Sequence, residues 1–409
     1  MTVTFINQVT VSFNFEYDME MLKKLRERDV KLSRKSVEAI HFYSSVFGML
    51  VVVFFLVRSY WNLIALRMDF YNNLWGPAYL LIHNQSPYDT ASLHPILSAL
   101  WYPMAVGFFF ALGLLEETIA TKAWFLLNLA ELFAIIMFTT RDKRKFYLTI
   151  IVGFLVYFFP PTLNHFVLGQ FSITAMLLLL ASVYFAEKKQ DWLSAFCLAL
   201  GISKPQLGIL AIIGLSSLYF QRGGFKSLAG YWLKILLMAL IMSLPLFISY
   251  PDWIPDWIKS TQSNYTWLQP SLYSTLKHTL GLWGFFFWIS ITIAGVILCF
   301  QLWKKSPPQI AMLWSLGLTT IISPYLWSWD YVLLLPIWMY IFTQIDWTEK
   351  IILLVVYIIG WVGIAFIQRL ENSSNDMFWW IPLWYMLSIT LVTRWKTGGL
   401  KGDIYQFTD

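Results

Sequence analysis

Long apolar runs recur along almost the whole chain, and short polar segments separate them. The first run covers residues 42–64, and the second covers residues 123–140. Runs of this length and apolarity are typical of helices that cross about 30 Å of hydrocarbon. The pattern therefore predicts an all-α polytopic membrane protein with about 12 transmembrane helices. The other expected spans are residues 146–159, 171–185, 192–202, 207–220, 228–248, 282–303, 310–322, 331–342, 351–367 and 378–392.

The composition agrees with this class. Hydrophobic residues make up 58% of the chain and charged residues only 13%, which excludes a soluble globular domain. The net charge of +6 lies mostly in short loops, where it orients membrane spans, so we expect no nucleic-acid partner. Cys197 and Cys299 fall in apolar runs and are interpreted as small core residues. No residues have the spacing of a dedicated metal site, and we expect neither a metal nor another cofactor.

Positive charge in short loops predicts the side of the membrane on which each segment lies. Residues 1–41 are polar and basic, so we expect a cytoplasmic N-terminal segment. One integral membrane domain at 42–395 and a cytoplasmic tail at 396–409 follow. We therefore expect a multi-pass protein of the plasma (inner) membrane, with both termini cytoplasmic.

The segment 102–115 decides the topology of the first half of the chain. It is apolar enough to cross the membrane but short. If it crossed, the basic cluster RDKRK at 141–145 would be exported, against the charge rule. We therefore expect it to lie in the interface or to re-enter, so that residues 67–122 form one outer loop with interfacial helices.

Asp69 stands directly after the first span, in the stretch RMDFYNNLWGPAYLLIHNQSPYD. An ionised carboxylate at this depth is costly unless it faces water, a partner or a substrate. An amphipathic helix is expected behind it, and the closing Ser-Pro-Tyr-Asp, which ends at Asp89, is typical of a turn. Asp69 is either a catalytic carboxylate at the membrane surface or a polar stop after a membrane anchor. A cation shared by Asp69 and Asp89 is a further alternative.

Other polar residues fall on the same expected outer face. Lys204 lies between two short apolar runs. A lysine costs about 2.5–3.5 kcal/mol at the membrane centre, so Lys204 either contacts a phosphate or snorkels to the interface. Asn164, His165 and Gln170 are expected in a proline-started loop, either as site residues or in a plain polar hairpin. Asp330 begins an inward span and is either a site residue or a carboxylate that the helix dipole favours.

One carboxylate beside a cation suits sugar transfer from a lipid phosphate. Glycoside hydrolysis normally needs two carboxylates, because one of them protonates a poor leaving group. A phosphate departs without protonation, so one base for the acceptor hydroxyl is enough, with cations to stabilise the departing charge. Asp69 together with Lys204 or His165 meets this requirement.

Four stretches carry a family resemblance, in this order: DFYNNLWGPAYLLIHNQSPYD, LGQFSITAMLLLLASVYFAEKK, LALGISKPQLGIL and SPYLWSWDYVLLLP. Over most of residues 45–340 the chain resembles the polyprenol-phosphate-mannose-dependent glycosyltransferases of family 87, in the GT-C membrane superfamily. The resemblance implies a GT-C-like helix bundle. It also implies an inverting enzyme that takes mannose or a related hexose from a polyprenyl-phosphate donor on the outer face.

The resemblance also implies roles for individual residues. It puts the general base at Asp69, and Gln170 and Lys204 occupy the GQ and KP positions of the family on the donor side. His165 and Asn164 are expected beside them as donor or phosphate contacts. The residues expected to line the substrates are Tyr71, Tyr88, Asp89, Trp329 and Asp330.

One departure from the family concerns the SP-x-x-W segment. Many members carry histidines after it, where this chain has Trp329 and Asp330. The donor sugar therefore stays open, and the phosphate contact is expected from His165 or Lys204 instead.

Two other functional classes stay open from the sequence. A flippase or transporter of lipid-linked saccharides would need polar groups through the full thickness of the bundle, whereas here they crowd the outer side. A non-catalytic scaffold would need neither Asp69 nor the cations. As partners we expect the lipid bilayer, a polyprenyl-phosphate sugar donor and a glycolipid or glycan acceptor of the cell envelope.

Overall fold

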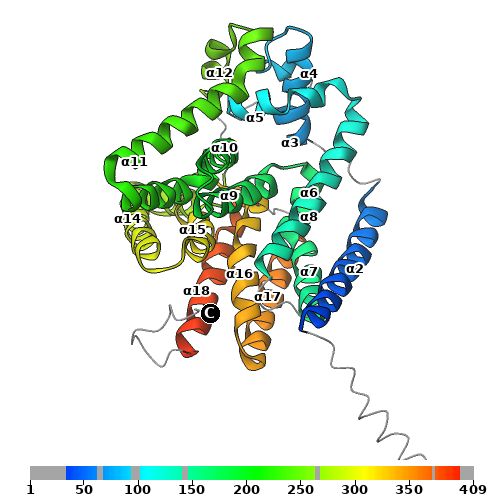
Figure 1. The fold of residues 1–409 in the computed structure, drawn as a ribbon, viewed down its shortest axis with the longest axis vertical. Coiled ribbons are helices and arrows are strands. Elements are labelled where there is room, and N and C mark those ends of the chain that lie inside the picture. Colours follow the sequence, from blue (N-terminus) through cyan, green and yellow to red (C-terminus); the bar gives the residue numbers. More distant parts are fainter. Residues whose placement is uncertain are drawn as a thin grey trace, which may run out of the picture.

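The computed structural model describes residues 34–61, 68–93, 102–140, 146–262, 268–370 and 374–396. Within these ranges the regular structure is entirely helical, which confirms the expected all-α class (Figure 1). Most of the expected cytoplasmic segment 1–41, the basic cluster at 141–145 and the tail from residue 397 onward lie outside the described residues. The domain boundaries inferred from the sequence therefore stay predictions.

The helices follow one another with short connections, and many neighbours in sequence pack against each other. The described α-helices are α2 (Arg34–Tyr60), α3 (Met68–Phe70), α4 (Gly76–Ile82), α5 (Pro103–Phe108), α6 (Glu117–Thr139), α7 (Phe146–Tyr157), α8 (Pro160–Leu168), α9 (Ser172–Glu187), α10 (Asp191–Gly201), α11 (Pro205–Ser249), α12 (Trp253–Thr261), α13 (Leu272–Leu280), α14 (Leu282–Lys305), α15 (Pro308–Ile322), α16 (Leu335–Gln344), α17 (Trp347–Ile367) and α18 (Ile381–Lys396). The described 3-10 helices are η3 (Thr90–Ser92), η4 (Phe110–Leu114), η6 (Ser328–Leu334) and η7 (Asn375–Phe378), and η2 (Tyr71–Trp75) is a π-helix.

Five of the described helices are long and apolar enough to cross a membrane, namely α2, α6, α11, α14 and α17. The bent pair α7 and α8, which meet at 59°, forms a sixth span if the pair is taken as one. The 45-residue α11 leaves helical geometry at Gly223 and Gly224, so it comprises the two successive helices that the sequence predicted. The protein is therefore a multi-pass membrane protein. The count of about 12 spans stays a prediction, because α9, α10 and α15 are apolar but shorter than a usual span.

Helix α10 packs against both α9 and α11, and α15 packs against α9, α11 and α14. Helix α2 packs along α7, and α17 packs against α18 (Figure 1). The inward face of α6 carries Trp124, Asn128, Glu131 and Ile135, which are all buried and recur at helical spacing. At one end of the bundle α3, α4, α5 and α12 gather (Figure 1). This end contains the described part of the first loop.

The run α3–η2–α4 is continuous over residues 68–82. Leu74, Ala78 and Leu81 are fully buried, as the helical spacing predicted. Gly113 of η4 lies so close to this run that a Cβ there would fall 2.5 Å from the backbone of Ala78. The run is therefore packed into the protein on more than one side, which differs from a helix with one face on the bilayer.

Residues 102–115 form two short helices, α5 and η4, which are divided at Phe109. The six residues of α5 extend about 9 Å, far less than the roughly 30 Å of the hydrocarbon core. Helix α5 buries Met104 and Ala105 and packs against α11. The segment thus contains no helix of spanning length. The side of the membrane on which it lies stays a prediction.

We expect the first loop to lie outside and the α9–α10 turn to lie inside, because the charge rule orients the spans in this way. Ala91, Glu116 and Lys188 are exposed, and Cys197 and Cys299 are buried. In a chain with alanine at both native cysteines, Ala91→Cys and Glu116→Cys should react with an impermeant thiol reagent in intact cells. Lys188→Cys should react only after permeabilisation. Labelling of position 188 in intact cells together with protection of position 116 would refute this topology.

Candidate active site

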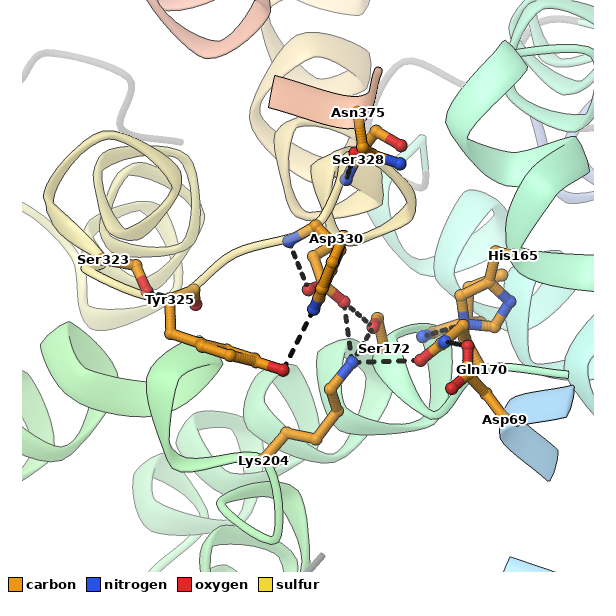
Figure 2. Close-up of polar contacts among 12 residues, drawn as sticks. Asp69, His165, Gln170, Ser172, Lys204, Ser323, Tyr325, Ser328, Asp330 and Asn375 are labelled. Carbon is orange, nitrogen blue, oxygen red and sulfur yellow. Dashed lines mark hydrogen bonds and ion pairs between the residues drawn. The ribbon is translucent and has the colours of Figure 1, made fainter. Parts of the chain in front are cut away.

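Lys204 stands in the turn between α10 and α11, directly before Pro205, which begins α11. The residue is buried, with 5% of its surface exposed, and its Nζ donates to Asp330 Oδ1 at 2.9 Å. It also donates to Gln170 Oε1 at 3.1 Å and to Ser172 Oγ at 3.3 Å (Figure 2). An ammonium group has three N–H donors, so each of them has an acceptor here. Lys204 is therefore a bonded interior cation and does not snorkel to the interface.

Asp330 is the counter-charge of this lysine and is fully buried. Its Oδ1 accepts from Lys204 and from Ser172 Oγ, and its Oδ2 accepts from the backbone N–H of Trp327 at 3.0 Å. The carboxylate thus accepts a backbone hydrogen bond at the start of η6, which agrees with the predicted role at a helix start. It also forms the ion pair with Lys204. Removal of one member of a buried ion pair costs about 3–5 kcal/mol, because the other charge is left unpaired. The pair therefore holds η6 against the α10–α11 turn.

Gln170 connects this ion pair to Asp69. Its Nε2 donates to Asp69 Oδ2, and its Oε1 accepts from Lys204 (Figure 2). Burial raises the pKa of the Asp69 carboxyl to about 6, Lys204 and the Gln170 hydrogen bond oppose this rise, and the charge of Asp330 adds to it. Asp69 is only partly buried. It is therefore a partly buried acidic residue whose carboxylate is connected to Lys204 through the Gln170 side chain.

The turn between α8 and α9 brings Gln170 against Asp69. Helix α8 ends at Gly169, whose φ of 67° lies in the left-handed region that favours glycine. A Cβ on Gly169 would also fall 2.5 Å from Cβ of Phe70. Trp124 donates from Nε1 to the Gly169 carbonyl at 3.1 Å and stacks on Phe70, with ring centroids 5.7 Å apart. The Gly-Gln turn is thus packed directly on the residue that follows Asp69.

Residues 160–168 form helix α8, which corrects the loop that the sequence predicted. Proline suits the first position of a helix, because its missing N–H would have no partner there. His165 is fully buried, and its Nε2 accepts from the backbone N–H of Ile173 at 3.0 Å, at the start of α9. Asn164 and Ser328 are among the residues that line a cavity of about 10 Å³. Among the described contacts, neither His165 nor Asn164 bonds to the lysine.

The residues expected to line the substrates are not all brought together. Trp329 stacks on Trp327 with ring centroids 5.1 Å apart, next to the buried carboxylate of η6. Tyr88 is buried in a small apolar cluster, where burial raises the pKa of its hydroxyl, and Asp89 is exposed in the expected turn. Tyr71 lines an open groove of about 650 Å³. Among the described contacts, neither Tyr88 nor Asp89 bonds to the lysine network.

Two polar contacts in this region were not anticipated. Ser172, the first residue of α9, bonds both members of the ion pair. Deeper in the bundle, Thr174 donates to Glu131 at 2.7 Å, and both residues are buried. Both contacts had a signal in the sequence, because a polar side chain within an apolar run has to find a partner.

The arrangement offers a carboxylate with a raised pKa, Asp69, and a buried cation, Lys204. An ionised Asp69 can accept a proton, and Lys204 can stabilise negative charge that develops nearby. Among the described residues, no group of three or more His, Cys, Asp or Glu side chains could hold a metal ion. That the chemistry needs no metal or cofactor stays a prediction.

A search among curated proteins found no match. A sequence model of glycosyltransferase family 87 matches residues 99–324. The matched range includes Gln170 and Lys204, whereas Asp69 and Asp330 lie outside it. The match is therefore narrower than residues 45–340, over which the sequence was expected to resemble the family. Because it nevertheless covers more than half of this multi-pass chain, the protein belongs to glycosyltransferase family 87 and is a membrane glycosyltransferase.

Proposed function

We propose that this enzyme transfers mannose or a related hexose from a polyprenyl-phosphate donor to an acceptor hydroxyl, with Asp69 as the general base. The observation that carries the proposal is the link from one partly exposed carboxylate, through Gln170, to the buried Lys204. Sugar transfer from a phosphate needs a proton acceptor and stabilisation of the departing anion. Family membership supports an enzyme of the GT-C type over a flippase or a scaffold.

In this reaction the acceptor oxygen attacks the anomeric carbon of the donor sugar, and its proton passes to the Asp69 carboxylate. The bond between the anomeric carbon and the phosphate oxygen breaks, and its electron pair leaves with the polyprenyl phosphate. Attack from the face opposite the leaving group inverts the anomeric configuration. The phosphate departs without a proton, so no second carboxylate has to act as an acid.

On the donor side, a phosphate that contacts Lys204 takes the place of one of its three acceptors. Ser172 is the best candidate for displacement, because its Oγ is the most distant of the three at 3.3 Å and it keeps its own bond to Asp330. His165 already accepts from a backbone N–H. It therefore supports the site by holding the start of α9, and the phosphate contact falls to Lys204.

The reaction is proposed for the outer face of the plasma membrane. Asp69 directly follows the first span, and the basic segment before that span orients it outward. The acceptor is then a glycolipid or glycan of the cell envelope. Trp329, which precedes Asp330 in the chain and stacks on Trp327, is proposed to line the donor side of the site.

The direct test is turnover by the purified protein of a panel of polyprenyl-phosphate sugars, followed as release of polyprenyl phosphate. We expect one or a few of these donors to be consumed, and nucleotide sugars to be left intact. Turnover of nucleotide sugars alone would contradict the proposal. So would an enzyme that consumes no lipid-linked donor with any glycan or glycolipid acceptor supplied.

The first prediction from this mechanism concerns the base. Asp69→Asn keeps the size of the side chain but cannot accept a proton at neutral pH, so kcat should fall by at least about 10² with donor affinity nearly unchanged. Asp89→Asn, at the exposed turn of the same loop, is the matched control and should keep near-normal kcat. Normal transfer by the Asp69 variant would remove it from the role of base.

The pH dependence follows from the raised pKa of Asp69. Only the ionised carboxylate accepts a proton, so kcat/KM should be level above about pH 6 and fall about tenfold per pH unit below it. Asp330→Asn removes a charge that raises this pKa, and Lys204→Met removes one that lowers it. The midpoint should therefore move to lower pH in the first variant and to higher pH in the second. Midpoints that shift in the same direction, or not at all, would contradict this assignment.

Donor affinity should depend on the charge of Lys204. Lys204→Met should weaken donor binding by roughly 1.5–3 kcal/mol, the scale of a charge-assisted hydrogen bond. Lys259→Met, at an exposed position of α12, is the control and should bind the donor normally. Because Lys204→Met leaves Asp330 unpaired, the double variant Lys204→Met/Asp330→Asn separates binding from folding. If it unfolds at the wild-type temperature and still binds the donor normally, Lys204 does not contact the phosphate.

A further inference from the structure

An open groove of about 650 Å³ lies beside the helical run that carries Asp69. It is formed mainly by η2, α4, η4 and the start of α6, and its volume falls within the roughly 300–1,000 Å³ that is usual for ligand sites. Gly113 allows its wall to close, because a side chain there would meet the backbone of Ala78 at 2.5 Å. Trp75 donates from Nε1 to the Leu115 carbonyl at 3.0 Å, which ties the wall to the start of α6. The groove is therefore a preformed feature of the fold.

One wall of the groove is a column of four rings spaced four residues apart, Tyr71, Trp75, Tyr79 and His83. Successive centroids lie 5.1, 5.1 and 4.2 Å apart. His83 Nδ1 lies 2.8 Å from the Tyr79 carbonyl, which fixes the last ring on the helix. Trp75 and Tyr79 are stacked and the two outer pairs are tilted, so the column offers ring edges and tyrosine hydroxyls to a ligand.

The charge of the lining separates this groove from the donor side. Glu116 and Glu117, at the start of α6, line it, and no lysine or arginine does among the described residues. Burial raises the pKa of the Tyr71 hydroxyl, and the negative charge of Glu117 and the neighbouring Tyr79 raise it further. These polar groups of the lining are therefore close enough to interact electrostatically. Carboxylates repel a phosphate but accept hydrogen bonds from neutral hydroxyls. The lining thus suits an uncharged polyol better than an anion.

We propose that this groove binds the neutral sugar rings of the glycan acceptor, an inference that rests on the proposed function. Asp69 lies two residues before Tyr71, or about 3 Å along the helix axis. A two-residue offset turns its carboxylate to a different side of the helix from the ring column. The groove therefore holds rings that are remote from the reacting hydroxyl. Leu114 at its rim is 70% exposed, which suits the lipid end of a glycolipid.

The charges of the two regions thereby direct the donor and the acceptor to different binding sites. The anionic donor phosphate belongs with the only cation in contact with the Asp69 network among the described residues, Lys204. The uncharged acceptor belongs in the groove that Glu116 and Glu117 line. Binding energy from remote rings can then position the acceptor without drawing the donor into the wrong site.

The test measures binding without turnover. The probes are tritiated methyl glycosides of mannose, glucose and galactose, with one or two rings, dialysed against the full-length protein in lipid nanodiscs. At least one disaccharide should bind saturably and more tightly than its monosaccharide, and inorganic phosphate should not displace it. Leu114→Trp fills the groove and should weaken this binding at least tenfold. Leu282→Trp is the matched control, because Leu282 is also 70% exposed but lies on another helix, and it should bind normally.

Glu117→Gln provides a second variant that changes charge with little change in shape. It should weaken disaccharide binding about three- to tenfold, whereas Asp252→Asn, exposed at the same end of the molecule, should not. Absence of saturable binding to the wild type, or equal binding by Leu114→Trp and the wild type, overturns the inference. If Leu114→Trp abolishes binding but no lipid-linked donor is consumed, the groove stands and the proposed function fails. If donors are consumed but Leu114→Trp leaves the acceptor KM unchanged, the groove alone fails.

Discussion

The buried ion pair between Lys204 and Asp330 is the interaction on which the rest of the site depends. A charge in a low-dielectric interior is tolerated only with a partner, and these two residues lie 126 positions apart. Their pairing joins the α10–α11 turn to η6, and the same ammonium group attaches Gln170 from the α8–α9 turn. The α8–α9 turn, the α10–α11 turn and η6 are thus held together by one ammonium group with three N–H donors. Asp69 acquires its orientation from this assembly through Gln170.

The site is built where helices are interrupted. Gly169 ends α8, Pro205 begins α11, and η6 precedes α16. An interruption frees backbone groups, which are tolerated at membrane depth only where the protein itself satisfies them. Side chains of the site form hydrogen bonds with these backbone groups, so the same residues that shape the site also stabilise its backbone. They are His165 at the Ile173 N–H, Asp330 at the Trp327 N–H and Trp124 at the Gly169 carbonyl.

Electrostatics organises the region around the helical run 68–82. Lys204 forms a direct ion pair with Asp330 and is connected to Asp69 only through Gln170. The pKa of Asp69 therefore stays near 6, high for an aspartate yet low enough to leave it ionised at neutral pH. Gln170 contacts its carboxylate, whereas Glu116 and Glu117 line the groove beside the same helical run.

Local chemistry in the sequence determined the class of the protein and most of its candidate residues. Apolar runs of spanning length predict helices, and a charged residue within such a run, as at Lys204, stands out because its burial needs a partner. Only the tertiary structure decided which candidates meet. It paired Lys204 with Asp330, turned His165 toward the start of α9, and folded residues 160–168 as a helix. Contacts between residues more than 100 positions apart, as for Gln170 with its partner in the first loop, depend on how the helices pack. Packing depends on the combined shapes of many apolar side chains, which no local pattern contains.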